Sequence, residues 1–335
     1  MTNHPRVVSL LPSATESLCA VGGEHLLVGR SHECDWPPSV LRLPSVTSQR
    51  IHDTDSARID ALVREHSTHT ADETPAAQSL YRLDEDALRQ LAPDIILTQD
   101  LCGVCCIHLD TVTAIAASMS SRPQVISLNP GTVEDILDDL LRIGNQVGLA
   151  GLATDAVVAL RERLFAAGEF VNPFDDGPSF AFLEWTDPLF VGGHWTVQLI
   201  ERAGATHPLN PTTIAAPHAG AAAGPQHGER KAGHSFVVSP QALLASLPQS
   251  LVICPCGFNL EKSLAAAELL ALQPWWNDLP AVRNGRVAVV DGTQMFNRPG
   301  PRVVDAFEWL VGWLHEVATP LGPHSLTFPW RPLRT

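Results

Sequence analysis

Short apolar runs alternate with stretches of helical periodicity along the first half of the chain. The runs predict strands at 7–11, 26–29, 94–98 and 125–128, and the periodic stretches predict helices over 84–91 and 133–147. Another helix is expected to open at Pro12, where Ser13 and Glu16 have the spacing of a capping box. Gly22 and Gly23 are expected to end that helix. This alternation is typical of a parallel α/β sheet.

The second half repeats the pattern after a long helical stretch over about 153–170. Strands are expected at 179–183, 250–253 and 287–290, and a closing helix at 302–315. We therefore predict two Rossmann-like α/β lobes joined by a single long helix, with a ligand cleft between the lobes. The expected boundaries are 1–150, 151–171 and 172–335. Two polar or low-complexity segments, 66–79 and 207–233, are expected to be unstructured, the second as a flexible surface excursion.

Composition narrows the classes of function. The chain has 335 residues, of which 45% are hydrophobic and 17% charged, enough for two buried cores. The formal net charge is -14, which disfavours nucleic acid and anionic membrane surfaces as partners. No apolar stretch approaches the roughly 18 residues of a membrane-spanning helix.

The start of the chain bears on localisation. Strand-like sequence begins at Arg6, with no charged segment and apolar region before it, so a cytoplasmic protein is expected from the sequence as written. A mature exported protein would begin in the same way, and such a protein would be periplasmic or extracellular.

Five motifs occur in order along nearly the whole chain. They are RVVSLLPSATE at 6–16, GRSHECDWPP at 29–38, LAPDIIL at 91–97, EWTDPLFVGGHW at 184–195 and NRPGPR at 297–302. Together they resemble the cobalamin-binding members of the class III substrate-binding proteins of ABC importers. The resemblance implies two lobes bridged by a rigid helix, a corrinoid or related metal-chelate ligand, and an ABC importer as partner. Relatives of this fold bind corrinoids, haem and iron chelates.

The loops after the expected strands hold the candidate ligand-binding residues, because ligands of α/β sheets bind at the carboxyl ends of the strands. Aromatic rings there suit a large planar ligand such as a corrin, although the same rings could cap the lobes' cores. The aromatic candidates are Trp36, Trp185, Phe190, Trp195, Phe258 and Phe296.

Polar residues in the same loops complete the set: Arg30, His32, Tyr81, Asp100, His194, Arg298 and Arg302. Neutral imidazole suits cobalt and iron, so His32 and His194 are candidate axial ligands or else ordinary loop residues. Arg298 and Arg302 could pair with ligand carboxylates or phosphate, and Arg302 could instead lie at the start of the last helix. The resemblance leaves the role of Tyr81 open. Four histidines in and beside the Ala/Gly-rich excursion, His207, His218, His227 and His234, could form a loose metal trap.

The chain has seven cysteines, and four of them follow expected strands. Cys34, Cys102, Cys105 and Cys256 could hold zinc or an iron–sulfur cluster if three loops converge. Buried small side chains or a redox-active dithiol are the alternatives. Cys19 and Cys254 are expected to lie in the core.

Signatures of enzymes are scarce in the sequence. It contains no phosphate loop, no G-x-S-x-G and no H-E-x-x-H, so binding is favoured over catalysis. The first hypothesis is a non-catalytic binding protein for a corrinoid or related metal chelate. The alternative is a cytoplasmic cysteine-ligated metal or iron–sulfur protein with redox or sulfur chemistry on the same fold.

Overall fold

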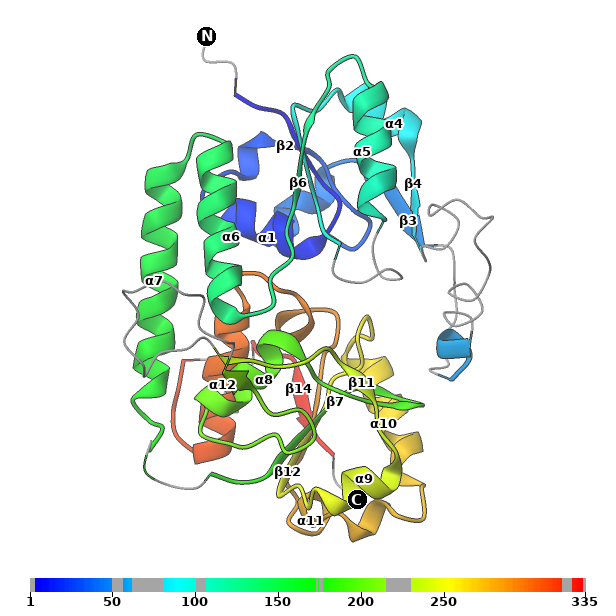
Figure 1. Cartoon of the computed structure of the whole chain (residues 1–335), viewed down its shortest axis with the longest axis vertical. Coiled ribbons are helices and arrows are strands. Elements are labelled where there is room, and N and C mark those ends of the chain that lie inside the picture. The colour runs from blue at the N-terminus through cyan, green and yellow to red at the C-terminus, as the bar shows by residue number, and fades with distance from the viewer. Residues whose placement is uncertain are drawn as a thin grey trace. The chain divides into compact units, whose positions relative to one another are not determined.

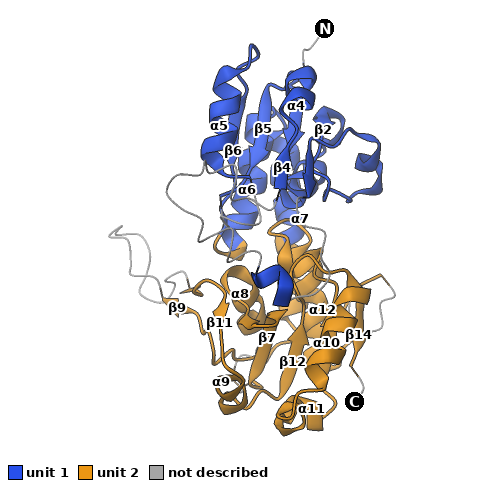
Figure 2. Cartoon of the chain, turned by 90° about the vertical axis from the view of Figure 1, so that its right-hand side faces the viewer, with its two compact units in different colours: residues 1–130, 134–160 blue, residues 131–133, 161–335 orange. Residues whose placement is uncertain are grey.

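The computed structural model describes residues 4–49, 57–61, 81–100, 107–172, 174, 177–214, 230–320 and 327–333 (Figure 1). The chain divides into two compact units, coloured separately in Figure 2. Unit 1 comprises residues 1–130 and 134–160, and unit 2 comprises residues 131–133 and 161–335. Among the described residues, no helix is long and apolar enough to cross a membrane.

Unit 1 is built on a four-stranded parallel sheet with the order β2-β1-β5-β6. Its strands are β1 (Val7–Ser9), β2 (Leu27–Gly29), β5 (Ile95–Thr98) and β6 (Gln124–Ser127). An antiparallel pair, β3 (Thr47–Gln49) and β4 (Tyr81–Leu83), forms a second sheet. The helices are α1 (Pro12–Ala20), α4 (Glu85–Leu91), α5 (Leu109–Ser118) and α6 (Val133–Gln146), with 3-10 turns η1 (Glu24–Leu26) and η2 (Pro38–Arg42).

The central strands of unit 1 are buried on both faces, which explains why they appear in the sequence as continuous apolar runs. All four residues of β5 and all three of β1 are buried. On one face, Val8 and Ile96 belong to a core cluster with Leu88 of α4 and Val112 of α5. The strands and helices expected in this half are confirmed, with ends shifted by a few residues.

The predicted capping box at the start of α1 is wrong. The helix begins at Pro12, its N-cap is Leu11, and no side chain caps it by a hydrogen bond. Proline is favoured in the first helical turn because it lacks the N–H that would otherwise need a partner. Ser13 is therefore the second residue of the helix, two positions after the N-cap.

Unit 2 contains a six-stranded mixed sheet with the order β11-β8-β7-β12-β13-β14, in which β7, β12 and β13 are parallel. Its strands are β7 (Phe180–Thr186), β8 (Leu189–Val191), β11 (Phe236–Val237), β12 (Ser250–Ile253), β13 (Val287–Val290) and β14 (Trp330–Pro332). A separate pair is formed by β9 (Thr213–Ile214) and β10 (Arg230–Lys231). The helices are α8 (His194–Arg202), α9 (Pro240–Ala245), α10 (Leu260–Ala271), α11 (Pro280–Arg283) and α12 (Val303–His315), with 3-10 turns η3 (Trp276–Asp278) and η4 (Met295–Asn297).

Successive residues of β7 pack into two different layers, as the period of a strand requires. Ala181 and Leu183 belong to a core cluster that includes Leu270 of α10. Their neighbours Phe180 and Phe182 instead contact Trp313 of α12 and Phe296, with ring centroids 6.2 and 5.1 Å apart. Because both faces of β7 are covered, its polar residues Glu184 and Thr186 lie at its carboxyl end.

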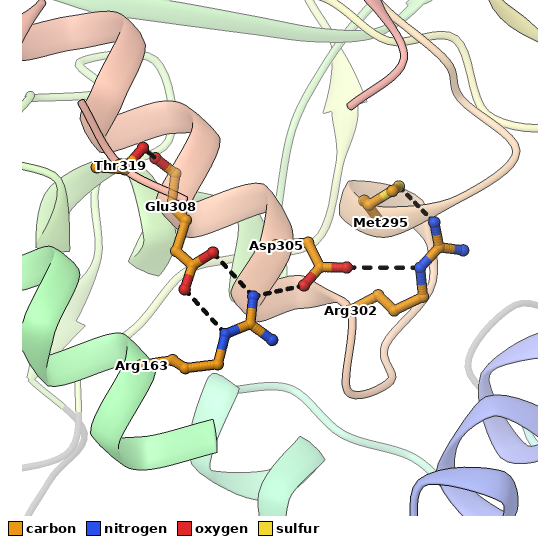
Figure 3. A network of polar contacts seen from close by, with 6 residues as sticks. All are labelled: Arg163, Met295, Arg302, Asp305, Glu308 and Thr319. Carbon is orange, nitrogen blue, oxygen red and sulfur yellow. Dashed lines mark hydrogen bonds and ion pairs between the residues drawn. The ribbon is translucent and has the colours of Figure 1, made fainter. Parts of the chain in front are cut away.

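The long helix expected over 153–170 is α7 (Ala150–Gly168), and the boundary between the units falls within it. Its unit 2 portion is held by Arg163, whose guanidinium donates to both carboxylate oxygens of Glu308 at 2.9 and 2.8 Å (Figure 3). The same group donates to Asp305 at 2.7 Å. These hydrogen bonds, that to Glu308 above all, raise the pKa of Arg163. Glu308 is only 2% exposed, so its carboxylate has little contact with water and Arg163 compensates for the lost hydration.

We predict that Arg163→Met lowers the free energy of unfolding by about 2–3 kcal/mol, because it leaves a buried carboxylate without its cation. The value is below that of a fully buried pair since Arg163 is 39% exposed. Arg163→Met with Glu308→Gln should recover part of the loss. Urea unfolding measures the stability of the single and the double variant. Lys262→Met, which removes an exposed cation on α10, is the control and should change the free energy of unfolding by less than about 0.5 kcal/mol. Equal effects of Arg163→Met and Lys262→Met would contradict this account of the ion pair.

The unstructured excursion expected over 207–233 is wrong for its first described residues, and residues 215–229 lie outside the described part of the chain. His207, Asn210 and Thr212 are 1%, 7% and 4% exposed, so they belong to the interior of unit 2. The ring nitrogens of His207 lie 3.3 Å from the amide nitrogen of Phe182 and 3.2 Å from that of Asn210. His207 is therefore a core residue and not part of a metal trap. His218 and His227 lie outside the described residues.

Burial lowers the pKa of His207 to about 4. The unfolded chain binds a proton near pH 6.5, so between pH 6.5 and 4 it carries more protons than the folded protein. We expect the free energy of unfolding to fall by up to about 3 kcal/mol as the pH falls from 6.5 to 4. Urea unfolding of wild type and His207→Gln is measured at several pH values. The unfolding free energy of the variant should lack this decrease between pH 6.5 and 4. An imidazole of His207 that titrates near pH 6.5 by NMR would contradict the assignment.

Candidate functional site

In unit 1 the loop after β2 is fixed by backbone and guanidinium hydrogen bonds. The side chain of Arg30 donates to the carbonyl oxygen of Ser31 at 2.9 Å, and more weakly to those of His32 and Leu41 at 3.5 Å. Its own backbone pairs with Pro44 and Val46. Arg30, predicted to bind ligand, thus supports the loop that carries His32.

The hydroxyl group of Thr47 holds both the backbone and the ring of His32 in place. The Oγ1 atom of Thr47 lies 2.7 Å from His32 Nδ1 and accepts the His32 backbone N–H at 3.0 Å. It also donates to Ser31 Oγ at 3.2 Å. Burial lowers the pKa of His32, and Arg30 acts in the same direction while Glu33 opposes it. The ring is therefore neutral at neutral pH.

Tyr81, the first residue of β4, lies beside this imidazole. Its hydroxyl donates to Glu33 Oε1 at 2.7 Å, and its ring meets that of His32 edge to face, with centroids 5.0 Å apart. The β3–β4 pairing brings Thr47 and Tyr81 to the same small sheet. His32, Thr47 and Tyr81, which are distant in sequence, thus form one cluster.

The other predicted residues of unit 1 differ in exposure. Trp36 is 45% exposed, and Asp100 is exposed with its backbone N–H bonded to Asn129 Oδ1 at 2.7 Å. Cys34 is fully buried and accepts a hydrogen bond from Thr15 Oγ1 at 3.0 Å. Trp36 and Asp100 are accessible to a ligand, whereas the Cys34 thiol faces the interior of the unit.

In unit 2 the loops after the three parallel strands converge as expected. Cys256 N donates to the carbonyl oxygen of Glu184 at 3.0 Å, which joins the loop after β12 to the end of β7. Gly257 N donates to the carbonyl oxygen of Gly292 at 3.0 Å, which joins it to the loop after β13. Asn297 Nδ2 donates to the carbonyl oxygens of Cys254 and Gly292, both at 3.0 Å.

Two predicted aromatic residues form a cross-strand pair at this edge. Trp185 of β7 lies opposite Phe190 of β8, so both side chains project from the same face. Both are partly exposed. The Trp185 ring packs against Phe258, with centroids 5.0 Å apart, and its Nε1 donates to the carbonyl oxygen of Asp187 at 3.0 Å. Phe258 is 5% exposed, so it supports the Trp185 ring from the interior of unit 2.

A second aromatic group lies where α8 begins. The ring of His194 stacks on Trp195 with centroids 5.6 Å apart and meets His234 edge to face at 4.7 Å. Trp195 Nε1 donates to the carbonyl oxygen of Phe296 at 2.8 Å. A Cβ atom on Gly193 would lie 2.5 Å from Ser235 N, so only glycine permits this close approach of the two backbones. Burial, and then the nearby His234, lower the pKa of His194.

Glu184 joins these loops from the end of β7. Its carboxylate accepts hydrogen bonds from Ser235 Oγ and from Gly193 N, the latter at 3.4 Å. Burial outweighs these hydrogen bonds and raises the pKa of Glu184 to about 7. The pairing of Glu184 with Ser235 joins positions 51 residues apart, so no local pattern in the sequence indicates it.

We predict that Glu184→Gln makes the protein more stable than wild type above pH 7 and no more stable near pH 4.5. The pKa of Glu184 in the folded protein is above its value of about 4.5 in the unfolded chain. The stability that Glu184 contributes is therefore fully present below pH 4.5 and is lost as the pH rises through about 7. Glutamine can still accept from Gly193 and Ser235 without carrying a charge. Urea unfolding at pH 4.5 and 8 tests this; a variant that is less stable at pH 8 would show that the ionised carboxylate is favoured.

Three predictions near η4 are corrected by burial. Phe296 is fully buried against Phe182, Trp309 and Phe328, so its ring presents no face to a ligand. Arg302 is the N-cap of α12, and its guanidinium contacts Gln294 at 2.7 Å and Asp305 at 3.6 Å. This leaves Arg302 in a structural role. Arg298 is 7% exposed, so it too is mostly withdrawn from the surface of unit 2.

The proposed cysteine site remains a prediction. Cys102 and Cys105 lie outside the described residues. Cys254 is buried as expected, and Cys256 is exposed. Among the residues that the structure describes, no group of three or more histidine, cysteine, aspartate or glutamate side chains is arranged to hold a metal ion.

Comparisons with known proteins identify the fold. No family model matches the chain, and no curated protein matches its sequence. The solved structures that match over nearly the full length of both chains include the three described next. A periplasmic haem-binding protein from Pseudomonas aeruginosa has a TM-score of 0.66 and 22% identity, covering 99% of each chain. The haem-binding protein RhuT from Roseiflexus sp. RS-1, in its apo form, has a TM-score of 0.65 and 19% identity, covering 94% of this chain and 99% of its own.

The third is the vitamin B12-binding protein BtuF of Vibrio cholerae, with a TM-score of 0.61 and 18% identity over 93% of this chain and 96% of its own. These identities establish likeness of fold. The sequence-based expectation of two α/β lobes joined by a long helix is thereby confirmed, and the chain has the fold of the class III substrate-binding proteins of ABC importers.

Proposed function

We propose that the protein is a non-catalytic binding protein for a planar metal chelate, either a corrinoid or a haem. The observation that carries the proposal is the partly exposed aromatic pair Trp185 and Phe190 at the carboxyl edge of the unit 2 sheet. Flat ligands gain most of their affinity from such faces, with a few polar groups fixing orientation. The similar structures named above are described as binding haem or vitamin B12.

Unit 1 offers a complementary set of groups at its own carboxyl edge. Trp36 supplies an exposed ring, Asp100 an exposed carboxylate and His32 a neutral imidazole. If both sets of groups bind the ligand, substitutions in either unit should weaken binding.

The proposal extends to an ABC importer as partner. A similar chain from Listeria monocytogenes is described as an ABC transporter substrate-binding protein. Several of the other similar proteins are described as periplasmic. Delivery to an importer would place this protein outside the cytoplasmic membrane.

We expect purified protein to bind hydroxocobalamin, cobinamide or haemin with micromolar or better affinity. Trp185→Ala and Trp36→Ala should each weaken binding about tenfold, because each removes an aromatic face worth roughly 1.4 kcal/mol. Equilibrium titration followed by visible absorption measures the affinities.

Trp275→Ala is the matched control, because Trp275 is a partly buried tryptophan that packs on the core cluster, between α10 and η3. Its affinity should equal that of wild type. The proposal is wrong if none of the three chelates binds the wild-type protein, or if Trp275→Ala weakens binding as much as Trp185→Ala does.

A further inference from the structure

The turn over 254–258, which follows β12, ends at the aromatic ring that supports Trp185. Phe258 is 5% exposed, and the centroid of its ring lies 5.0 Å from that of Trp185. Trp185 is partly exposed, so its ring can meet a ligand on one side while it packs against Phe258 on another. The position of the Trp185 ring therefore depends on where the turn holds Phe258.

The side chain of Asn297 joins this turn to the loop after β13. Its amide nitrogen Nδ2 donates to the carbonyl oxygens of Cys254 and Gly292, both at 3.0 Å. Both partners are acceptors, so the amide must direct its nitrogen and not its oxygen toward them. Asn297 is itself fixed in η4, where its backbone N–H donates to the carbonyl oxygen of Gln294 at 3.3 Å. The amide thus connects three segments of unit 2.

Gly292 is the residue at which the turn and Asn297 meet. Its carbonyl oxygen accepts from Gly257 N at 3.0 Å as well as from Asn297. Its own N–H donates to the carbonyl oxygen of Phe258 at 2.7 Å. A Cβ atom on Gly292 would lie 1.8 Å from the carbonyl oxygen of Pro255, so only glycine permits this approach of the two loops. The bonds from Asn297 therefore act on a contact that includes Phe258 itself.

We propose that Asn297 is a positioning residue for chelate binding, and that it acts through the turn and Phe258 on the Trp185 ring. The inference rests on the proposed function, which assigns Trp185 to the ligand. Without the donor at Nδ2, the carbonyl oxygen of Cys254 loses its side-chain partner and the turn can shift. A displaced Phe258 would let the Trp185 ring tilt. A tilted ring loses contact with a flat ligand, because stacking depends on close approach of the two faces.

A matched control exists at the other end of β12. The guanidinium of Arg283 also donates to two backbone carbonyl oxygens, that of Asn277 at 3.1 Å and that of Asp278. Arg283 belongs to α11, which is joined to the amino end of β12, because Ala281 N donates to the carbonyl oxygen of Pro248 just before the strand. Arg283→Met therefore removes a similar pair of hydrogen bonds at the end of the strand opposite the turn.

The first test measures affinity by titrating hydroxocobalamin, cobinamide and haemin into each protein. Asn297→Asp keeps the shape of the side chain but replaces the donor with an oxygen that the two carbonyl oxygens repel. We expect it to weaken binding about fivefold, as the loss of roughly one net hydrogen bond would. Asn297→Ala should weaken binding in the same direction, and Arg283→Met should bind as tightly as wild type.

A double-mutant cycle with Trp185→Ala shows whether Asn297 acts through this ring. In the Trp185→Ala background, Asn297→Asp should change the affinity by less than about twofold, because the ring whose position it alters is absent. The ring is also observed without ligand, by fluorine NMR of protein labelled with fluorotryptophan. The Trp185 resonance, assigned by its absence in Trp185→Ala, should shift in Asn297→Asp and stay in place in Arg283→Met.

The results separate this inference from the proposed function. Equal weakening by Asn297→Asp in both backgrounds, or an unchanged Trp185 resonance, would overturn the positioning role and leave the proposed function standing. Urea unfolding shows that each variant is folded, and Asn297→Ala takes the place of Asn297→Asp in both tests if the carboxylate prevents folding. Wild type that binds none of the three chelates would overturn both proposals, a result that needs no variant.

Discussion

Burial of both faces of the parallel strands is the constraint on which the arrangement of each unit depends. In β7, alternate residues enter two different hydrophobic layers, and β12 and β13 are buried throughout. With both faces covered, the strand ends are where polar and partly exposed aromatic groups can lie. Glu184, Trp185 and the loop at Cys256 all occur at such ends in unit 2, and His32 follows β2 in unit 1.

The same constraint made much of the fold predictable from sequence. Continuous apolar runs located β12 and β13 to the residue, because a strand buried on both faces is apolar along its length. Helical periodicity located α7 and α12 within a few residues. The start of α1 at Pro12 was predicted correctly, but its capping was not, because the proline takes the first helical position and places Ser13 inside the helix.

The candidate site was only partly predictable. Loop position selected His32, Trp36 and Trp185 correctly as groups at strand ends, but it could not separate Trp185 from Phe296, which is fully buried. Nor could it find Thr47, which contacts His32 through a strand pair, β3–β4, that joins segments far apart in the chain. The hydrogen bond from Tyr81 to Glu33 joins residues 48 positions apart, so no local sequence pattern predicts it.

Retention of a metal chelate by this protein is tested most directly by the stoichiometry of bound metal. The full chain is mixed with hydroxocobalamin or haemin, passed through a desalting column, and analysed for protein, cobalt and iron. We predict a coloured protein that elutes with about one cobalt or one iron per chain. A colourless protein with neither metal, from both mixtures, would contradict the account.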